Sequence, residues 1–216
     1  MKPIILDLCG GTGAWSRPWA ESGEYDIIII TLPHYDVRFY DIGEFTIRFH
    51  GKDGSPDITV RYEDIYGILA APPCTDFSIA ANRLWKQKDE SGQTAISIEI
   101  VRTCLKIIDK CKPKFWALEN PAPPKCRIAR CVQELGKPRL IFDPCDYGDS
   151  WKKKTAIWGD FVRPVKWFTM KKGTIGFTDN MKGHGEERRA KRSITPPGFA
   201  RAFFEANRIR KEAGDG

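Results

Sequence analysis

Short apolar runs, separated by longer segments in which apolar and polar residues mix, recur along the first half of the chain. Runs with the length and content of buried strands lie at residues 4–8, 27–30, 66–70 and 115–118. Between them, residues 16–23 and 94–110 carry apolar positions at helical spacing, which predicts helices packed on a sheet. Strands that alternate with helices are typical of α/β proteins, so we predict a mostly parallel, doubly wound sheet.

Residues 44–62 interrupt this rhythm. Apolar and polar residues alternate at 45–49 and again at 57–60, with glycine, serine and proline between the two runs. Alternation with a period of two is the pattern of a half-buried strand, so these residues predict an inserted β-hairpin. Further on, residues 83–92 turn polar and basic, and we expect a mobile loop there that closes over a substrate.

Residues able to do chemistry follow three of the predicted strands. Residues 71–78, Ala-Pro-Pro-Cys-Thr-Asp-Phe-Ser, place Cys74 in a polar loop directly after one strand. Another strand ends in Glu119 and Asn120, and the first strand leads into the glycine-rich turn 9–13. In open parallel sheets, ligands collect at the carboxyl ends of the strands. The pattern therefore predicts a site at this edge, with Cys74 as a nucleophile.

Each of these features also has a structural alternative. Free cysteines are often small buried hydrophobes, Glu119 can be an ordinary strand-end carboxylate, and a glycine turn can simply connect a strand to a helix. The turn is not the nucleotide-binding pattern Gly-x-Gly-x-x-Gly, and no Walker lysine follows it. A phosphate-binding role for the turn is therefore disfavoured, whereas the polar neighbours of Cys74 favour an accessible thiol.

The glycine turn, the Pro-Cys loop and the Glu-Asn strand end come in the same order as in the DNA cytosine-5 methyltransferase family, which this chain resembles. Residues 143–159 look like the family's Tyr-Gly segment, and residues 192–200 are similar to the Thr-Pro segment that opens a late helix. The likeness touches nearly the whole chain and is greatest to compact phage or prophage forms. It implies a single domain over residues 1–216 with a Rossmann-like fold. It also implies an enzyme whose activity depends on S-adenosylmethionine.

The resemblance implies methyl transfer to carbon 5 of cytosine in DNA, through a covalent cysteine adduct. Cys74 would add to carbon 6 of the ring, and Glu119, if burial keeps it protonated, would serve as the acid at ring nitrogen 3. The family's basic pair suggests Lys152 and Lys154 as cations beside the exocyclic oxygen of the ring. A solvated run of surface lysines is the alternative for these two residues.

The family's motifs also indicate the residues that would bind the cofactor. They are Asp7, Cys9, Gly10, Gly11, Gly13, Trp15, Thr31, Asp36 and Pro72. Cys9 stands where the family carries an aromatic ring, and Thr31 stands where it carries an acidic residue, so we expect a cofactor pocket that binds more weakly or is arranged differently. Asp36 is the candidate for the next acidic contact, with Asp64 as a rival. The alternative for Trp15 is that its ring packs in the core of the protein and not against the cofactor.

The formal net charge of +7 favours a polyanionic partner, and the basic residues concentrate in the second half of the chain, including residues 208–211. The residues expected to contact nucleic acid are Ser78, Arg83, Lys153, Arg188 and Arg192. In the family, a target-recognition region lies between the Tyr-Gly segment and the Thr-Pro segment. The resemblance implies that this region is reduced here to residues 160–191. We therefore expect short or loose sequence specificity, on duplex or single-stranded DNA, with the target cytosine extruded or already unpaired.

Other features bound the class of protein. The seven cysteines form no Cys-x-x-Cys pair and the three histidines lack ligand spacing, so neither a disulfide framework nor a metal site is predicted. The chain runs directly into a strand without a leader pattern, and no apolar run approaches the ~20 residues that cross a bilayer. These observations favour a monomeric cytoplasmic enzyme of a bacterial or phage-infected cell, with a role such as restriction-modification.

Two alternatives stay open. RNA is one possible substrate, because a branch of the family acts on transfer RNA. The other is a protein that binds nucleic acid without catalysis and retains the methyltransferase fold, with Cys9 and Thr31 in place of cofactor contacts.

Overall fold

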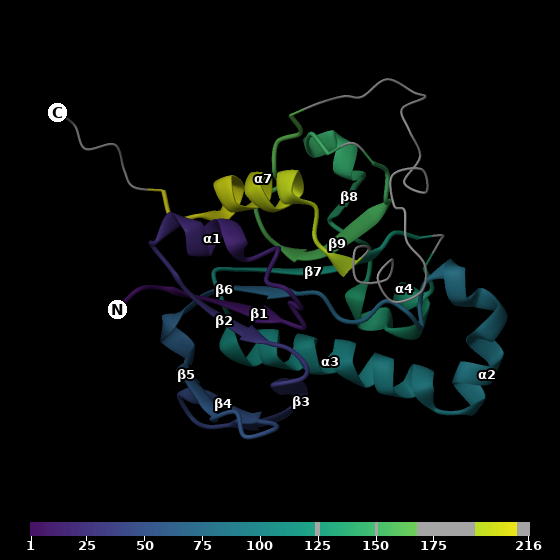
Figure 1. The fold of residues 1–216 in the computed structure, drawn as a ribbon, viewed down its shortest axis with the longest axis horizontal. Helices are drawn as coiled ribbons and strands as arrows, with labels where there is room; N and C mark the ends of the chain where they lie inside the picture. Colours follow the sequence, from purple (N-terminus) through teal and green to yellow (C-terminus); the bar gives the residue numbers. More distant parts are fainter. Residues whose placement is uncertain (124–125, 150, 168–192, 211–216) are drawn as a thin grey trace.

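A six-stranded central sheet runs through the protein (Figure 1), whose computed structural model describes residues 1–123, 126–149, 151–167 and 193–210. From edge to edge its strands are β2 (Asp26–Ile30), β1 (Ile4–Leu8), β6 (Ile65–Ala70), β7 (Phe115–Pro121), β9 (Thr155–Asp160) and β8 (Leu140–Phe142). The first four strands are parallel, and β9 runs antiparallel to both β7 and β8. The predicted α/β fold with a mostly parallel sheet is confirmed.

Each face of this sheet has its own layer and its own core. In β1, Ile4, Leu6 and Leu8 enter one apolar core and Ile5 enters the other, as the alternation of side chains along a strand requires. Helix α3 (Gln93–Cys111) covers the first face. Helices α1 (Arg17–Ser22) and α7 (Pro197–Asn207) cover the second face (Figure 1).

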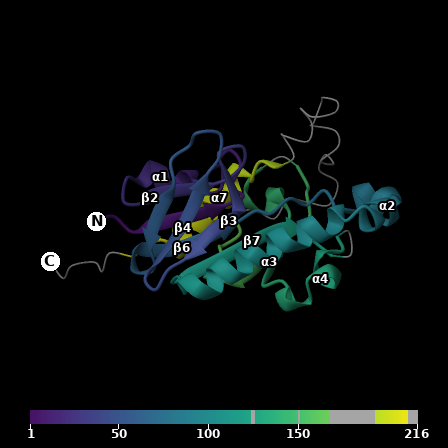
Figure 2. The same ribbon diagram turned by 90° about the horizontal axis from the view of Figure 1, so that it is seen from below.

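A small antiparallel sheet lies beside α3 on the first face (Figure 2). It contains β3 (Tyr35–Ile42), β4 (Thr46–Gly51) and β5 (Ile58–Arg61), in that order. The two strands expected within residues 44–62 are present as β4 and β5, and β3 adds a third strand to them. The pairing of β3 with β4 shifts in register between Tyr35 and Tyr40, and this irregularity hides the strand from a simple alternation pattern.

The prediction of a mobile loop at residues 83–92 is wrong, because most of these residues are helical in the structure. Residues Ile79–Leu84 form a 3-10 helix and Trp85–Glu90 form α2, which leads through Gly92 into α3. Polar composition is shared by loops and by helices whose polar groups find partners, so composition alone misled the prediction.

Arg127 supplies those partners. Its side chain donates hydrogen bonds at 2.9 Å to both carboxylate oxygens of Asp89 and at 2.9 Å to the backbone oxygen of Asp76. The guanidinium carbon lies 4.6 Å from the centre of the Trp85 ring, and a further 2.9 Å bond reaches Thr94. One buried cation thus ties α2 and the start of α3 to the loop that follows Cys74.

No helix in the described ranges is long and apolar enough to cross a membrane.

Candidate active site

The direction of the strands brings the three predicted motifs to one edge of the central sheet. Because β1, β6 and β7 are parallel neighbours, their carboxyl ends open on the same side. The glycine turn follows β1, the Pro-Cys loop follows β6, and Glu119 lies near the end of β7. Strand β9 runs the opposite way, so the lysines before its first residue reach this edge as well. We call this side the carboxyl edge.

The glycine turn is built on backbone conformations that favour glycine. Gly11 and Gly13 have φ angles of 56° and 67°, and Cys9 holds a φ of 58° without being a glycine. A Cβ atom on Gly10 would come within 2.3 Å of the Asp7 carboxyl carbon, so this position also excludes a side chain. A Cβ atom on Gly11 would meet nothing within 4 Å, so the outer side of the turn is open.

Asp7 supports the turn from beneath. Its side chain is fully buried, and the Ser16 hydroxyl donates a 2.6 Å hydrogen bond to one carboxylate oxygen. The other oxygen has no hydrogen-bond partner among the residues that the structure describes. Burial raises the pKa of Asp7 to about 7, against the lowering effect of the Ser16 hydrogen bond. Asp7 thus has its contacts beneath the turn, and its role at the cofactor stays a prediction.

The raised pKa of Asp7 predicts a dependence of stability on pH. The folded protein holds this proton more tightly than the unfolded chain, so the contribution to stability is full below the ordinary pKa of 3.8 and is lost as the pH rises through about 7. In the unchanged protein the free energy of unfolding should fall by a few kcal/mol over this range, because each pKa unit corresponds to roughly 1.4 kcal/mol. We expect Asp7→Asn to abolish this fall. Urea unfolding between pH 4 and pH 8 measures it.

The control for this measurement is Asp26→Asn, at an exposed position where β2 begins. Its free energy of unfolding should follow that of the unchanged protein at every pH. Curves for Asp7→Asn and the unchanged protein that run parallel would show that the buried carboxyl titrates normally.

Two positions considered for the cofactor, Trp15 and Asp64, have other surroundings. Trp15 is 1% exposed, and its ring lies 6.0 Å from that of Phe199 and 5.5 Å from that of Phe203. This is a correction, because a ring enclosed by α7 has no surface left for a cofactor. Asp64 precedes β6 and so lies at the opposite edge of the sheet, which removes it as a rival to Asp36.

Thr31 and Asp36 both make contacts within the protein. The Thr31 hydroxyl accepts a 3.3 Å hydrogen bond from the Gly11 backbone, which joins the end of β2 to the glycine turn. The Asp36 carboxylate is 2.7 Å from the Arg38 guanidinium, whose hydrogen bonds lower the pKa of Asp36. Asp36 is buried on β3, so any further contact that it makes has to share its oxygens with Arg38.

The Pro-Cys loop is anchored on both sides of the cysteine. The backbone oxygen of Pro72, a buried residue, accepts a 3.1 Å hydrogen bond from the Asn120 side chain. The backbone oxygen of Cys74 accepts bonds of 3.1 and 2.9 Å from the amides of Phe77 and Ser78, which closes a tight turn. Cys74 itself is partly exposed, as the prediction of a nucleophile requires.

Glu119 faces a lysine that the sequence analysis had placed among the DNA contacts. A carboxylate oxygen of Glu119 lies 3.6 Å from Nζ of Lys153, and the two side chains are only 15% and 16% exposed. In the part of the chain that the structure describes, Lys153 is thus the lysine of this run within 4.0 Å of the Glu119 carboxylate, and the role of Lys152 and Lys154 stays a prediction. Lys154 is exposed. Burial and the nearby carboxylates of Asp146 and Asp143 raise the pKa of Cys145, and Lys152 lies close enough to that thiol to offset part of the rise.

Strand register explains which lysine reaches Glu119. In the antiparallel pairing of β7 and β9, Glu119 lies opposite Ile157 and Pro121 lies opposite Thr155. Side chains of such pairs project to the same face, and every second residue returns to that face. If the alternation is continued by two residues before β9, it brings Lys153 to the side of Glu119, in agreement with the 3.6 Å between them.

Cys126 lies between the Pro-Cys loop and the end of β7. Its thiol is 3.7 Å from the Asn120 side-chain oxygen, and an isolated β-bridge joins its backbone to Ser78. Burial raises the pKa of Cys126 to about 12, and the charges of Cys74 and Glu119 both add to this effect. Asn120, the neighbour of Glu119, thus bonds both Cys126 and the Pro72 oxygen two residues before Cys74, and these contacts join the end of β7 to the Pro-Cys loop at the carboxyl edge.

The residues predicted to contact nucleic acid are only partly described. Ser78 is partly exposed and Arg83 is exposed, both on the segment that follows Cys74. Arg188 and Arg192 lie outside the described residues, as does most of the expected recognition region 160–191. Within the described ranges, the histidine, cysteine, aspartate and glutamate side chains form no group of three that could hold a metal ion.

Comparison with known proteins gives this geometry a family. The C-5 cytosine-specific DNA methylase family matches residues 6–122, a stretch that contains the glycine turn, the Pro-Cys loop and Glu119. The Type II methyltransferase M.DdeI of Desulfomicrobium norvegicum is 27% identical over 161 residues, which are 67% of this chain. The chain spans 37% of the length of that relative.

A solved crystal structure, described as a DNA modification methyltransferase encoded within a prophage of E. coli, aligns with 74% of this chain and 47% of that one. The identity is 14% and the TM-score is 0.38. The family match, in contrast, extends over more than half of the 216 residues. This chain belongs to the C-5 cytosine-specific DNA methylase family.

Proposed function

We propose that this protein transfers a methyl group from S-adenosylmethionine to carbon 5 of cytosine in DNA, through a covalent adduct with Cys74. The observation that carries the proposal is the arrangement of the Pro-Cys loop and the Glu119 strand end side by side at the carboxyl edge, where the Asn120 side chain bonds both Pro72 and Cys126. The family match over residues 6–122 supports the same chemistry. On this proposal the chain is one catalytic domain with a small recognition region, and it acts as a monomer in a bacterial or phage-infected cell.

The glycine turn fits the proposed cofactor. Its outer side is open at Gly11, and the positive φ angles of Cys9 and Gly13 turn the backbone sharply at the end of β1. We propose that these residues, with Thr31 and Asp36, hold S-adenosylmethionine, which when bound supplies the methyl group. The Cys9 thiol lies against the thiol of Cys104 in α3, whose pKa is raised by this hydrogen bond and by burial. At this position, where the family carries an aromatic ring, the small Cys9 side chain thus contacts α3 instead.

The side chains at the carboxyl edge have separate tasks in the proposed reaction. Cys74, as a thiolate, would form a bond to carbon 6 of the cytosine and thereby make carbon 5 nucleophilic. Glu119 would donate a hydrogen bond or a proton to ring nitrogen 3 while electron density moves toward carbon 5. After methyl transfer, loss of the proton from carbon 5 to a base releases the thiolate.

Lys153 would stabilise the negative charge that develops on the polar side of the ring. We expect Lys153→Gln to lower methyl transfer about a hundredfold, because a cation at this place acts in a poorly solvated site. Lys152→Gln and Lys154→Gln are matched controls that remove the same charge from adjacent positions. Initial rates with labelled S-adenosylmethionine measure all three, and a larger loss in either control would return the assignment to the neighbouring lysines.

A direct assay tests the proposed function. Purified protein is incubated with labelled S-adenosylmethionine and, in separate reactions, duplex DNA, single-stranded DNA or transfer RNA. We expect label in DNA, and bisulfite sequencing should place it on cytosine. Label in RNA alone would replace the DNA substrate by RNA. No transfer, with no binding of S-adenosylmethionine by calorimetry in the presence of DNA, would identify a non-catalytic member of the family.

A further inference from the structure

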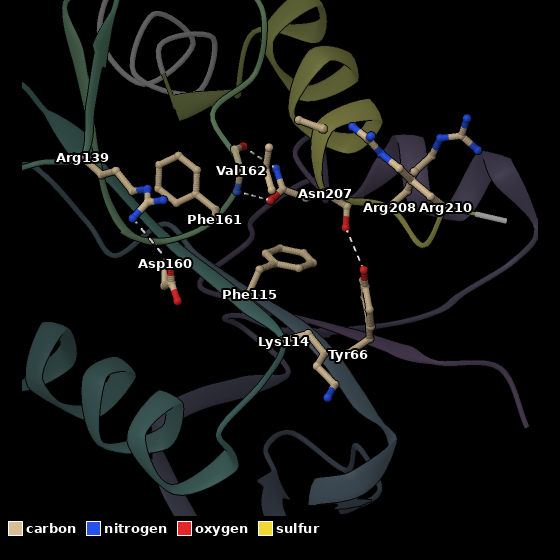
Figure 3. A pocket seen from close by; sticks show the side chains of 11 residues that line it. Tyr66, Lys114, Phe115, Arg139, Asp160, Phe161, Val162, Asn207, Arg208 and Arg210 are labelled. Carbon is tan, nitrogen blue, oxygen red and sulfur yellow. Dashed lines mark hydrogen bonds and ion pairs between the residues drawn. The ribbon is translucent and has the colours of Figure 1, made fainter. Parts of the chain in front are cut away.

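A hollow lies at the end of the central sheet opposite to the carboxyl edge (Figure 3). It has a volume of about 530 Å³. Tyr66 lies near the start of β6, Phe115 begins β7, and Asp160 ends the antiparallel strand β9, so all three mark the other end of the sheet. None of the residues proposed for catalysis or cofactor binding lines this hollow, which we call the back pocket.

The back pocket is lined by more positive than negative charge. Lys114, Arg139, Arg208 and Arg210 contribute four cations, and Asp160 contributes one carboxylate, 3.4 Å from Arg139. Arg208 has an ion pair with Glu205 at 2.9 Å, beside the pocket. Lys114 and Arg210 have no carboxylate within 4.0 Å in the described part of the chain. Two cations, on opposite sides of the pocket (Figure 3), are therefore available to an anionic ligand.

The wall of the back pocket is held by hydrogen bonds between distant segments. The Asn207 side chain accepts a 2.8 Å bond from the Val162 amide and donates a 3.0 Å bond to the Val162 oxygen. The Tyr66 hydroxyl donates to the backbone oxygen of Asn207 at 3.1 Å, on the side of the Phe115 ring (Figure 3). The Arg139 guanidinium carbon is 5.6 Å from the centre of the Phe161 ring. A wall arranged before a ligand arrives lowers the entropic cost of binding.

We propose that the back pocket binds the phosphate group of a nucleotide or of a nucleic-acid strand, at a site separate from the catalytic one. Arginine side chains match phosphate oxygens with paired hydrogen bonds, and a lysine adds a point charge. The volume lies within the range of small-ligand sites, roughly 300 to 1,000 Å³. The basic residues 208–211, which the sequence analysis counted among those that favour a polyanionic partner, contribute Arg208 and Arg210 to this pocket and not to the carboxyl edge.

The proposal is tested by binding and does not require methyl transfer. Cys74→Ser protein is titrated with AMP, with pyrophosphate and with a labelled 12-nucleotide single strand, before and after Lys114→Ala and Arg210→Ala are introduced together. Lys106→Ala with Lys110→Ala, on an exposed face of α3, is the control with the same loss of charge. Circular dichroism checks that each variant is folded.

We expect the back-pocket variant to bind its ligand about tenfold more weakly, while the control changes binding less than twofold. Weakened binding of AMP and pyrophosphate indicates a free nucleotide as the ligand. A loss for the strand alone, with a shallower dependence of affinity on salt, indicates nucleic acid. The proposal is overturned if the folded back-pocket variant binds all three probes as the control does, or if none of the probes binds the protein before substitution.

Discussion

Replacement of Cys74 by serine is expected to lower methyl transfer by on the order of a thousandfold or more, without loss of the fold. A hydroxyl is a much weaker nucleophile than a thiolate, so carbon 6 of cytosine would no longer be attacked and carbon 5 would not be activated. The position is suited to this role because the backbone oxygen of Cys74 closes a tight turn and the residue stays partly exposed. Initial rates at saturating DNA and S-adenosylmethionine measure the loss.

Cys131→Ser is the matched control for this substitution. Cys131 is also partly exposed but lies in the short helix α4 (Ile128–Cys131), outside the proposed machinery. Its serine variant should retain most of the activity, and thermal unfolding should confirm that both variants are folded. Activity of Cys74→Ser within tenfold of the unchanged protein would mean that another group, or no covalent step, is responsible.

Glu119→Gln is expected to lower kcat by roughly 10²- to 10⁴-fold, the usual contribution of a positioned acid or base. The amide keeps the size of the side chain and can still donate a hydrogen bond, but it cannot transfer a proton to ring nitrogen 3. The loss should fall on kcat rather than on KM for DNA, because the proton moves only during the reaction. Steady-state kinetics with a single-site oligonucleotide separates the two constants.

Glu99→Gln is the control, since Glu99 is 62% exposed on α3 and pairs loosely with Arg38 at 3.6 Å. It should leave both constants unchanged. The ion pair of Glu119 with Lys153 is also lost in Glu119→Gln, so stability must be compared as well. If Glu119→Gln changes stability but leaves kcat within a few-fold of the unchanged protein, Glu119 is a structural partner of Lys153 and not the acid.

The sheet and the place of the site were predictable because they depend on local patterns and one topological rule. The apolar runs of β1, β6 and β7 are recognisable without knowledge of their neighbours. Parallel strands then place their carboxyl ends together, which assembles the glycine turn, Cys74 and Glu119. Helix α1 likewise ends at Gly23, whose φ of 68° is the conformation expected of a glycine after a helix.

The details that sequence reasoning missed depend on pairing between distant segments. Lys153 reaches Glu119 because of the register between β7 and β9, and nothing in a run of three lysines reveals that register. If the alternation of side chains in β9 is extended two residues before its start, it favours Lys153 over Lys152 and Lys154. In the same way, the polar residues 83–92 are helical because Arg127, far along the chain, takes Asp89 as its partner.

Trp15 shows the same limit from the side of the core. An aromatic residue after a glycine turn has the same sequence signal whether it covers a ligand or enters the protein interior. Trp15 lies in the interior because its ring packs against Phe199 and Phe203 of α7, which are far from it in the sequence. Only the packed second face of the sheet distinguishes the two roles.

The central claim is that the Cys74 thiol and the Glu119 carboxyl act on one cytosine beside a methyl donor. It is tested most directly with DNA in which 5-fluorocytosine replaces cytosine, because fluorine at carbon 5 cannot leave as a proton and the covalent intermediate persists. Incubation with S-adenosylmethionine is expected to yield a denaturation-resistant protein–DNA adduct, with the modified peptide containing Cys74. A folded protein that binds both DNA and S-adenosylmethionine but forms no adduct, or forms it at another residue, would contradict the account.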